Sequence, residues 1–401
     1  MNTVVQKYGG TSVKTIERME HIADKVIHKI NKGYNVVLVV SAMGKTTNRL
    51  IEMAKSISTN PSKRELDMLM STGEQVSISL LSMILKERGY DSIALTGFQA
   101  GIMTEGIHTK NKITQVKIDN IKKHIKQGKV VVVAGFQGIN ETGDITTLGR
   151  GGSDTTAVAL AAKLKCTCEI YTDVEGIYSI DPRVYPKARK LKYISYEEMM
   201  EMSSLGAKVM EPRSVELGNK YNVPIYVASS HKATKGTYIK EFDKFMEQKS
   251  ITGLSLSENV LMITINNVPY SPKSISDVFG KLASEEVNID MISQTSPREG
   301  YVNISFTTSK EDEEIIDRVI NGLKKEINNI KIQKDTNITK ISVIGMGMRH
   351  ESGVASKVFK LFADHSIEFK QVTTSEISIS YTIKSKDKER AISVLTKEFN
   401  L

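Results

Sequence analysis

"TTLGRGGSDTTAVALAAKL" spans residues 146–164 and decides the fold class of the first part of the chain. It places one arginine and paired glycines directly before an alanine-rich segment that is typical of a buried helix. Glycines let a backbone approach a ligand closely, and Ser153 and Asp154 are expected to cap the helix. The N-terminus of this helix favours an anion, and Arg150 adds a planar guanidinium group that is suited to clamping a carboxylate. The segment therefore predicts an anion site rather than an ordinary glycine turn.

A second glycine turn occurs near the start of the chain, in "VVQKYGGTSVK" (4–14). Lys7 precedes Gly9 and Gly10 at the end of an apolar run. A lysine beside free backbone amides can neutralise the charge of a phosphoryl group in transfer. The stretch is not a Walker P-loop, because no Gly-Lys pair precedes Thr11 or Ser12. Taken alone, it fits a surface turn equally well.

Three further stretches carry polar side chains after predicted strands or at predicted helix starts. "SAMGKTTNRL" (41–50) offers hydroxyl groups, and "STGEQVS" (71–77) places Glu74 at an expected helix start, where a carboxylate can receive an ammonium group. A first-turn acid that complements the helix dipole is the commoner reason for such a residue. "YTDVEGIYSIDPRVYPKAR" (171–189) is a turn-rich loop. Its candidates for a nucleotide pocket are Thr172, Asp173, Tyr178, Asp181 and Arg183.

Short β-branched runs alternate with amphipathic segments through residues 1–240. The runs are "VVQKYG", "NVVLVVSAMG", "SIALTG", "KVVVVAGFQG", "CEIYTDVEG" and "VPIYVASS", and the expected helices are 15–31, 63–88, 111–127, 153–165 and 196–221. Nearly continuous apolar runs indicate strands buried on both faces. The alternation predicts an α/β fold, a three-layer αβα sandwich with a mainly parallel sheet. Ligands of such sheets bind at the carboxyl ends of the strands.

An internal repeat follows residue 240. Residues 261–293 match residues 341–373 at a constant offset of 80, with Val278 and Phe279 equivalent to Val358 and Phe359. Each copy predicts the order β-α-β-β-α-β, a ferredoxin-like module used twice. The predicted domains are therefore 1–240, 250–330 and 338–401.

Composition excludes several classes of protein. The net charge is +9, but the lysines are spread along the chain without interleaved aromatic residues, so no nucleic-acid partner is expected. Cys166 and Cys168 form a lone C-x-C, which supplies neither a zinc site nor a disulfide framework, and no metal site of the protein's own is expected. The apolar runs are of strand length and Met1 leads directly into a strand. We therefore expect no membrane span, no signal peptide and a cytoplasmic location.

Together these motifs resemble the aspartate kinases of the amino-acid kinase family, in the shorter form with two C-terminal ACT modules. "KYGGTSV", "TTLGRGGSDTTA", "TDVEGIYSIDPR" and "GAKVMEPRSVELG" (206–218) occur in the family's order, and the resemblance covers essentially the whole chain. It implies MgATP-dependent phosphorylation of the β-carboxylate of L-aspartate, with Mg²⁺ carried by the nucleotide. That reaction opens the routes to lysine, threonine, methionine and diaminopimelate.

The resemblance also implies a role for each matched residue. Lys7 would stabilise the phosphoryl group, Asp154 would orient that lysine, Arg150 would clamp the α-carboxylate, and Glu74 with Thr47 would hold the amino end. Gly151, Gly152 and Ser153 would complete the substrate site. ATP would be bound by Lys7, Tyr8, Gly9, Gly10, Ser41, Thr172, Asp173, Tyr178, Asp181, Arg183 and Lys208.

The ACT modules imply feedback by an amino acid and a homo-oligomer joined through residues 250–401. The effector site would use Asn288, Ile289, Asp290 and Gln294, close to residues 270–280 and 366–372. "PYSPKS" departs from the family's turn, because Lys273 stands where glycine is usual, and Ser352 stands where proline is usual. The effector is left open between lysine, threonine, both together and none.

Other functions remain in view at this stage. A different amino-acid kinase is disfavoured by the presence of both Arg150 and Glu74, which suit an α-amino acid. A non-catalytic amino-acid sensor is disfavoured by the intact set of Lys7, Glu74, Arg150 and Asp154. A fused homoserine dehydrogenase does not fit the length of the chain. A dinucleotide-binding turn in "VIGMGMRHESG" (343–353) is disfavoured because its third glycine is missing.

Overall fold

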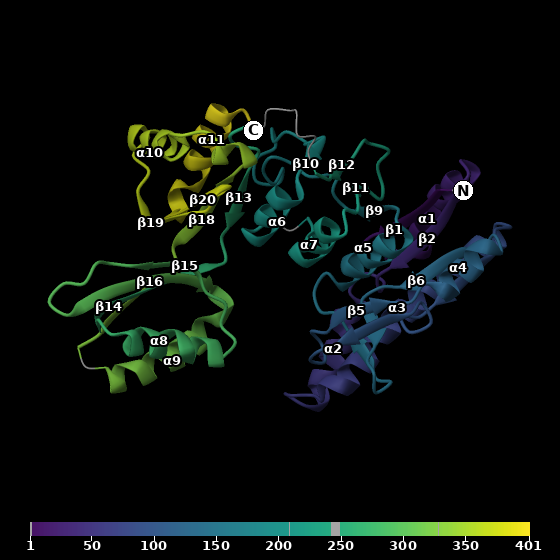
Figure 1. The fold of residues 1–401 in the computed structure, drawn as a ribbon, viewed down its shortest axis with the longest axis horizontal. Helices are drawn as coiled ribbons and strands as arrows, with labels where there is room; N and C mark the ends of the chain where they lie inside the picture. Colours follow the sequence, from purple (N-terminus) through teal and green to yellow (C-terminus); the bar gives the residue numbers. More distant parts are fainter. Residues whose placement is uncertain (1, 208, 242–248, 328) are drawn as a thin grey trace. The chain divides into compact units, whose positions relative to one another are not determined.

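The computed structural model describes residues 2–207, 209–241, 249–327 and 329–401 (Figure 1). The chain forms two compact units. One comprises Met1–Tyr178, Lys190–Ser203 and Lys208–Met246, and the other Ser179–Arg189, Ser204–Ala207 and Glu247–Leu401. Each unit is described by itself below.

The first unit is built on an eight-stranded sheet whose central strands are parallel, as predicted. Its order is β10 (Tyr193–Ile194), β12 (Thr237–Ile239), β11 (Ile225–Ser229), β9 (Thr167–Thr172), β1 (Asn2–Tyr8), β2 (Tyr34–Val40), β6 (Val130–Ala134) and β3 (Ser92–Leu95). Each neighbouring pair from β11 to β3 is parallel, and β12 runs antiparallel to β11. All six predicted strands are therefore confirmed. Their carboxyl ends lie along one edge of the sheet.

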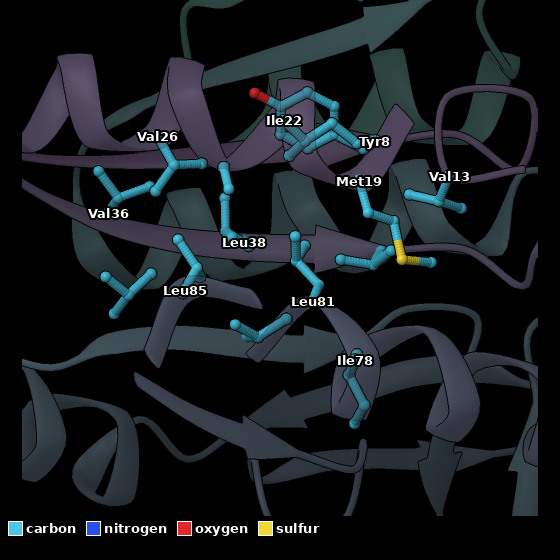
Figure 2. Packing of buried hydrophobic residues seen from close by; sticks show 14 of the residues in the cluster. Tyr8, Val13, Met19, Ile22, Val26, Val36, Leu38, Ile78, Leu81 and Leu85 are labelled. Carbon is cyan, nitrogen blue, oxygen red and sulfur yellow. The ribbon is translucent and has the colours of Figure 1, made fainter. Parts of the chain in front are cut away.

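Helices cover both faces of this sheet. The core in Figure 2 joins α1 (Ile16–Asn31) and α3 (Lys63–Glu87) to one face, where Val36 and Leu38 meet Ile22 and Leu81. Val37 and Val39 are equally buried and point to the opposite face, because side chains alternate along a strand. There α5 (Gly152–Leu164) packs on β1, β2 and β9. The three-layer αβα sandwich is confirmed.

Two predicted helices differ from the structure. Residues 111–127 form β5 (Lys112–Val116) and then α4 (Asp119–Lys126), because "KITQV" pairs with β4 (Ile102–Glu105). These strands join β7 (Gln137–Ile139) and β8 (Ile145–Thr147) in a second small sheet, ordered β5-β4-β7-β8. Residues 196–221 form α6 (Tyr196–Ser204) and α7 (Pro212–Lys220), and Pro212 starts the second helix. The remaining helix, α2 (Thr46–Ile57), follows β2.

The helix α3 corrects the expectation that no apolar segment reaches membrane-spanning length. Within the described residues it is the one helix long and apolar enough to cross a membrane, and half of its apolar window is buried in the fold. It also carries the buried carboxyl groups of Asp67 and Glu74. Those features are typical of a core helix, which passes the same test of length and composition.

The second unit contains two four-stranded antiparallel sheets. The first has the order β15 (Asp290–Gln294), β16 (Tyr301–Ser309), β14 (Val260–Pro269) and β17 (Lys331–Asp335). The helices α8 (Pro272–Ser284) and α9 (Glu313–Glu326) pack together on it (Figure 1), and η1 (Lys310–Asp312) precedes α9. This is the predicted β-α-β-β-α-β order.

The second sheet has the order β19 (Phe369–Thr374), β20 (Ser378–Lys384), β18 (Ile338–Ile344) and β13 (Gly253–Ser257). Its helices are α10 (Val354–Asp364) and α11 (Lys388–Phe399), and two short turns of helix, η2 (Met346–Arg349) and η3 (Ser385–Asp387), lie between its elements. The strand β13 takes the place that β17 has in the first sheet. Residues 253–257 were expected in the first module, but Ile251 and Leu254 are buried in the core of the second. The second module is therefore made of two separated segments.

Residues 179–189 also belong to this second unit. Ile180 is buried in the core of the second module, and the Leu254 amide donates a hydrogen bond to the Ser179 carbonyl oxygen (2.6 Å). The loop 171–189, which the sequence presents as continuous, is thus divided between the two units after Tyr178.

Candidate active site

Lys7 and Asp154 meet at the carboxyl edge of the large sheet. The Lys7 Nζ lies 2.6 Å from Asp154 Oδ1, and both side chains are nearly buried. Lys7 is the penultimate residue of β1, and Asp154 lies in the first turn of α5. The sheet and the helix therefore bring together the two residues for which catalytic roles were predicted.

The start of α5 differs from the prediction in one respect. Ser153 and Asp154 do not cap the helix, because Gly151 is the N-cap residue, in the left-handed conformation (φ 66°) and without a side-chain hydrogen bond. A Cβ atom on Gly151 would lie 2.4 Å from the Glu211 side chain, so only glycine fits. Ser153 instead approaches the end of β6, where a Cβ on Gly135 would lie 2.7 Å from its Oγ. The Gly152 amide donates to the Gly149 carbonyl oxygen (3.1 Å), so the amides of Ser153 and Asp154 are the donors that the start of α5 offers to a ligand.

Arg150 is exposed between Gly149 and Gly151, both of which have positive φ angles. Within the described residues no hydrogen bond or ion pair holds its guanidinium group. Burial raises the pKa of Glu211, and the nearby charge of Arg150 opposes that rise. The arginine is therefore available to an external anion at the start of α5.

Glu74 is buried in the middle of α3, not at a helix start as predicted. Its Oε1 accepts a hydrogen bond from the Ala42 amide (3.0 Å), and its Oε2 has no partner within the described part of the chain. Burial raises the pKa of Glu74 to about 7. Gly73 permits this approach, because a Cβ there would lie 2.8 Å from the Ala42 side chain. A buried carboxylate with one free oxygen is suited to receiving a cation.

Ser41 directly precedes Ala42, whose amide binds this carboxylate, and Thr47 follows in the first turn of α2. Ser41 follows β2, and its amide donates to the Tyr8 carbonyl oxygen (3.2 Å), so the ends of β1 and β2 are joined. Thr47 is half-buried in the first turn of α2, which packs on α3. Both residues therefore lie in the stretch from the end of β2 to the first turn of α2, close to the carboxyl end of β2.

The Gly9–Gly10 turn packs closely against the turn after β2. The Gly44 amide donates to the Gly10 carbonyl oxygen (2.9 Å), and a Cβ on Gly10 would lie 2.8 Å from the Ala42 carbonyl oxygen. Tyr8 was predicted to contribute to the ATP site. It is fully buried and stacks on Tyr171 with ring centroids 5.0 Å apart, so only its backbone can face a ligand.

The remaining candidates for nucleotide binding are divided between the two compact units. Thr172 ends β9 and donates a hydrogen bond to Asp173 (3.0 Å), and Tyr178 bridges to Lys190 in the same unit. Asp181 and Arg183 belong to the second unit, where Arg183 donates to both carboxylate oxygens of Asp181 and holds the pKa of that carboxyl below its usual value. Lys208 lies outside the described residues.

The four candidate effector residues lie together at the β15 edge of the sheet β15-β16-β14-β17. Asn288 and Ile289 precede β15, and Asp290 and Gln294 are its first and last residues. Asp290 pairs with the buried Lys340 of the second module. Gln371 on β19 donates hydrogen bonds to the Met291 carbonyl oxygen and to Ser293 Oγ (3.0 Å). Residues 366–372 are thus close to this edge, as predicted.

The other predicted wall of the effector pocket, residues 270–280, lines a separate hollow. Its volume is about 470 Å³, and it is lined by Pro269, Lys273, Ser274, Asp277, Tyr301, Glu326, Ile327 and Asn329. None of these residues comes from 288–294. At Lys273, where glycine is usual in the resembled turn, the helix start is closed by Ser271, whose Oγ accepts from the Ser274 amide (3.1 Å).

Two residues near the site, one buried and one half-buried, were not predicted. Asp67 on α3 is completely buried, and Arg213 on α7 donates to two backbone carbonyl oxygens. Arg213 stands within "GAKVMEPRSVELG", but neither spacing nor periodicity indicated its partners. Asp67 precedes Glu74 by two helical turns on the buried face, which was the available signal.

Comparison with known proteins bears on the whole chain. The model of the amino acid kinase family matches residues 2–229, and ACT domain models match residues 271–328 and 341–399. The aspartokinase of Geobacillus stearothermophilus is 45% identical over 100% of this chain and 98% of its own length, and aspartokinase 2 of Bacillus subtilis is 44% identical with the same coverage.

A solved structure shares the fold over the full length. Aspartokinase III of E. coli, in complex with aspartate and ADP, has a TM-score of 0.80 at 24% identity, and 100% of each chain is covered. The same enzyme in complex with lysine and aspartate also has a TM-score of 0.80, with 99% of each chain covered.

Proposed function

Because this chain belongs to the aspartokinases, which combine an amino acid kinase domain with two ACT domains, we propose that it phosphorylates the β-carboxylate of L-aspartate with ATP. The product would be 4-phospho-L-aspartate. The observation that carries the proposal is the pairing of Lys7 with Asp154 beside the open N-terminus of α5.

The chemistry requires positioning and charge neutralisation rather than a general base. A β-carboxylate is already ionised at neutral pH and can attack phosphorus directly. Lys7 stabilises the charge on the phosphoryl oxygens in transfer, and Asp154 holds the lysine ammonium at the strand end. The uncapped amides of α5 add donors for an anion at the same place. Each of these groups is fixed by the fold before substrate binds.

Magnesium is expected to arrive with the nucleotide. The described residues contain no group of three His, Cys, Asp or Glu side chains spaced to hold a metal ion. In enzymes that use ATP, Mg²⁺ is commonly bound through the substrate phosphates and water. When bound, Mg²⁺ neutralises phosphate charge. Lys7 acts on the same phosphate oxygens from the protein side.

Aspartate recognition is assigned to two charges of opposite sign. Arg150 clamps the α-carboxylate, supported by its unpaired guanidinium, and Glu74 receives the ammonium group through its free Oε2. Thr47 adds a hydroxyl group at the amino end, and Gly151, Gly152 and Ser153 let the start of α5 approach the substrate. The aspartate and ADP complex of the E. coli relative supports the pairing of these two ligands.

The nucleotide is assigned to the ends of β1, β2 and β9. The backbone of Tyr8, Gly9 and Gly10 and the hydroxyl of Ser41 line the phosphate path, while Thr172, Asp173 and Tyr178 bind the nucleoside end. From the resemblance of their motifs, "TDVEGIYSIDPR" and "GAKVMEPRSVELG", we also propose Asp181, Arg183 and Lys208 as nucleotide-binding residues.

Regulation is assigned to the ACT modules. An amino-acid end product, lysine or threonine, would bind at Asn288, Ile289, Asp290 and Gln294, and the lysine complex of the E. coli relative supports this class of effector. The enzyme would act in the cytoplasm, at the entry to lysine, threonine, methionine and diaminopimelate synthesis.

We propose a homo-oligomer joined through residues 250–401. Sedimentation equilibrium at micromolar concentration tests this proposal, and a monomer would contradict it.

A coupled assay of ADP release tests the reaction. Aspartate, glutamate and N-acetylglutamate are supplied in turn as acceptors with MgATP. Aspartate is expected to be the preferred acceptor for two reasons. N-acetylglutamate lacks the ammonium group that the buried Glu74 would receive, and glutamate carries one more methylene group, a difference that typically changes kcat/KM about 10-fold to 200-fold. Turnover with N-acetylglutamate and none with aspartate would refute the proposal.

A further inference from the structure

The segment Thr147–Gly151, which presents Arg150, is held by side chains from two helices, the half-buried Arg213 and the buried Asp67. On one side Arg213 of α7 donates one hydrogen bond to the Leu148 carbonyl oxygen (3.0 Å) and another to the Asn111 carbonyl oxygen (2.9 Å). Its two terminal nitrogens thus tie the segment to the neighbouring loop. A lysine has a single ammonium group and cannot reproduce this fork.

On the other side Asp67 of α3 accepts hydrogen bonds from three residues. The Thr147 hydroxyl donates to its Oδ1, the Thr109 amide lies 3.1 Å from both oxygens, and the His108 Nδ1 lies 2.7 Å from its Oδ2. A buried carboxylate is costly unless its oxygens are satisfied, and here both oxygens have partners. Asp67 therefore fixes Thr147 and the loop 107–111 to the same point of α3.

Two backbone hydrogen bonds also hold Thr147 and Leu148. The Asn111 amide donates to the Thr147 carbonyl oxygen (3.0 Å), and the Leu148 amide donates to the Phe136 carbonyl oxygen (2.9 Å). Immediately afterwards the chain passes through Gly149 and Gly151, whose φ angles are 77° and 66°. Glycine has the greatest backbone freedom of all residues, so Gly149 and Gly151 do little to fix Arg150 themselves. The position of Arg150 therefore depends on Thr147 and Leu148, which are held by hydrogen bonds.

We propose that Arg213 and Asp67 are positioning residues that hold residues 147–148 and so direct Arg150 to the α-carboxylate of aspartate. The inference rests on the proposed function, because it assigns Arg150 to aspartate binding. Neither residue touches the substrate. Both act through the segment that carries the guanidinium group, and a displacement of that group by about 1 Å is sufficient to weaken substrate positioning greatly.

Steady-state kinetics of Arg213→Ala in the full-length protein test this role. Loss of the two hydrogen bonds is expected to raise the KM for aspartate about 10-fold to 100-fold and to change the KM for ATP less than about twofold. Arg213→Lys restores at most one of the two hydrogen bonds and is expected to lie between Arg213→Ala and wild type. Arg88→Ala is the matched control, because Arg88 also donates to a backbone carbonyl oxygen, that of Glu20 (3.1 Å).

A double-mutant cycle separates positioning from a general structural role. If Arg213 acts only through Arg150, adding Arg213→Ala to Arg150→Ala is expected to change kcat/KM for aspartate less than about twofold. Multiplicative effects in the double variant, or equal losses for aspartate and ATP in Arg213→Ala, would overturn the inference. Asp67→Asn serves as a second variant and is expected to show the same selectivity for aspartate. A wild type inactive toward aspartate would refute the proposed function itself, and the inference with it.

Discussion

The ammonium nitrogen of Lys7, at the end of β1, lies 2.6 Å from a carboxylate oxygen of Asp154, in the first turn of α5. The pair is nearly buried, so each charge depends on the other for stabilisation. When a phosphoryl group arrives, the lysine can serve it without leaving the aspartate. The relationship joins the two glycine motifs of the sequence in one catalytic arrangement.

Replacing Lys7 is expected to lower kcat with little change in aspartate KM. Lys7→Met removes the charge, and Lys7→Arg keeps the charge and the partner but moves the donor atoms. Both variants should lose about a hundredfold or more in kcat, the typical effect of removing one preorganised donor to a developing charge. Lys32→Met, at an exposed position after α1, is the control. A near-normal kcat for Lys7→Met would show that the charge is not used in the transfer.

Arg150→Ala is expected to weaken aspartate binding and leave ATP binding unchanged. Only the amino acid presents the carboxylate that the guanidinium clamps, and loss of one partner of a desolvated charge pair typically costs about 2–5 kcal/mol. Isothermal titration with aspartate and, separately, with an ATP analogue measures the two affinities. Arg64→Ala, an exposed arginine paired with Asp144, is the control for loss of a surface charge. An unchanged aspartate affinity would remove Arg150 from the site.

Aspartate binding is expected to depend on pH through Glu74. Burial raises the pKa of this carboxyl to about 7, so below pH 7 it is mostly protonated and must lose a proton to pair with an ammonium group. The aspartate dissociation constant should therefore rise as the pH falls through 7, by up to about tenfold per unit. Titration calorimetry at pH 7 in buffers of different ionisation enthalpy should show proton release. Binding without any proton release would contradict the assignment.

Ionisation of Glu74 favours aspartate binding but lowers the stability of the folded protein. The variant Glu74→Gln tests this second effect. The carboxyl ionises near its usual value of 4.5 in the unfolded chain and near 7 in the folded one, so folded wild type loses stability as the pH rises between these values. The difference amounts to about 3 kcal/mol at most. Glu74→Gln should melt higher than wild type at pH 8, with a smaller gap at pH 5, while losing aspartate binding.

The effector site is expected to respond to changes at the edge strand β15. Asn288→Ala with Gln294→Ala should abolish inhibition by lysine or threonine and leave uninhibited turnover unchanged, because an effector alters activity only through its preference for one conformation. Gln333→Ala is the matched control, an exposed glutamine on the opposite edge strand, β17. Inhibition of the double variant at wild-type effector concentrations would place the site elsewhere.

The strands of the catalytic domain were predictable because their signals are local, whereas the roles of Lys7 and Asp154 were expected from the resemblance of their motifs to those of the aspartate kinases. A buried parallel strand such as "VVVVA" can be recognised from its own residues, and a lysine before paired glycines is visible in a few positions. The repeat likewise exposed both ACT modules, because their helices and strands recur at a fixed offset.

Features that depend on distant partners were not predictable in the same way. The strand β13 has the pattern of any short strand, and only its pairing with β18 assigns it to the second module. Nothing around Asp67 announces that Thr147 and Thr109 will satisfy it. Asp181 and Arg183 share a motif with Tyr178, yet the chain passes into another compact unit between them.

The identity of the phosphorylated product tests the central claim most directly. Aspartate and MgATP are incubated with the enzyme in the presence of hydroxylamine, which converts an acyl phosphate into a stable hydroxamate, and the product is identified by NMR spectroscopy. The proposal predicts the β-hydroxamate of aspartate, formed in proportion to ADP and at least about a hundredfold more slowly with Lys7→Met. Formation of the α-hydroxamate, or ADP release without any hydroxamate, would contradict transfer to the β-carboxylate.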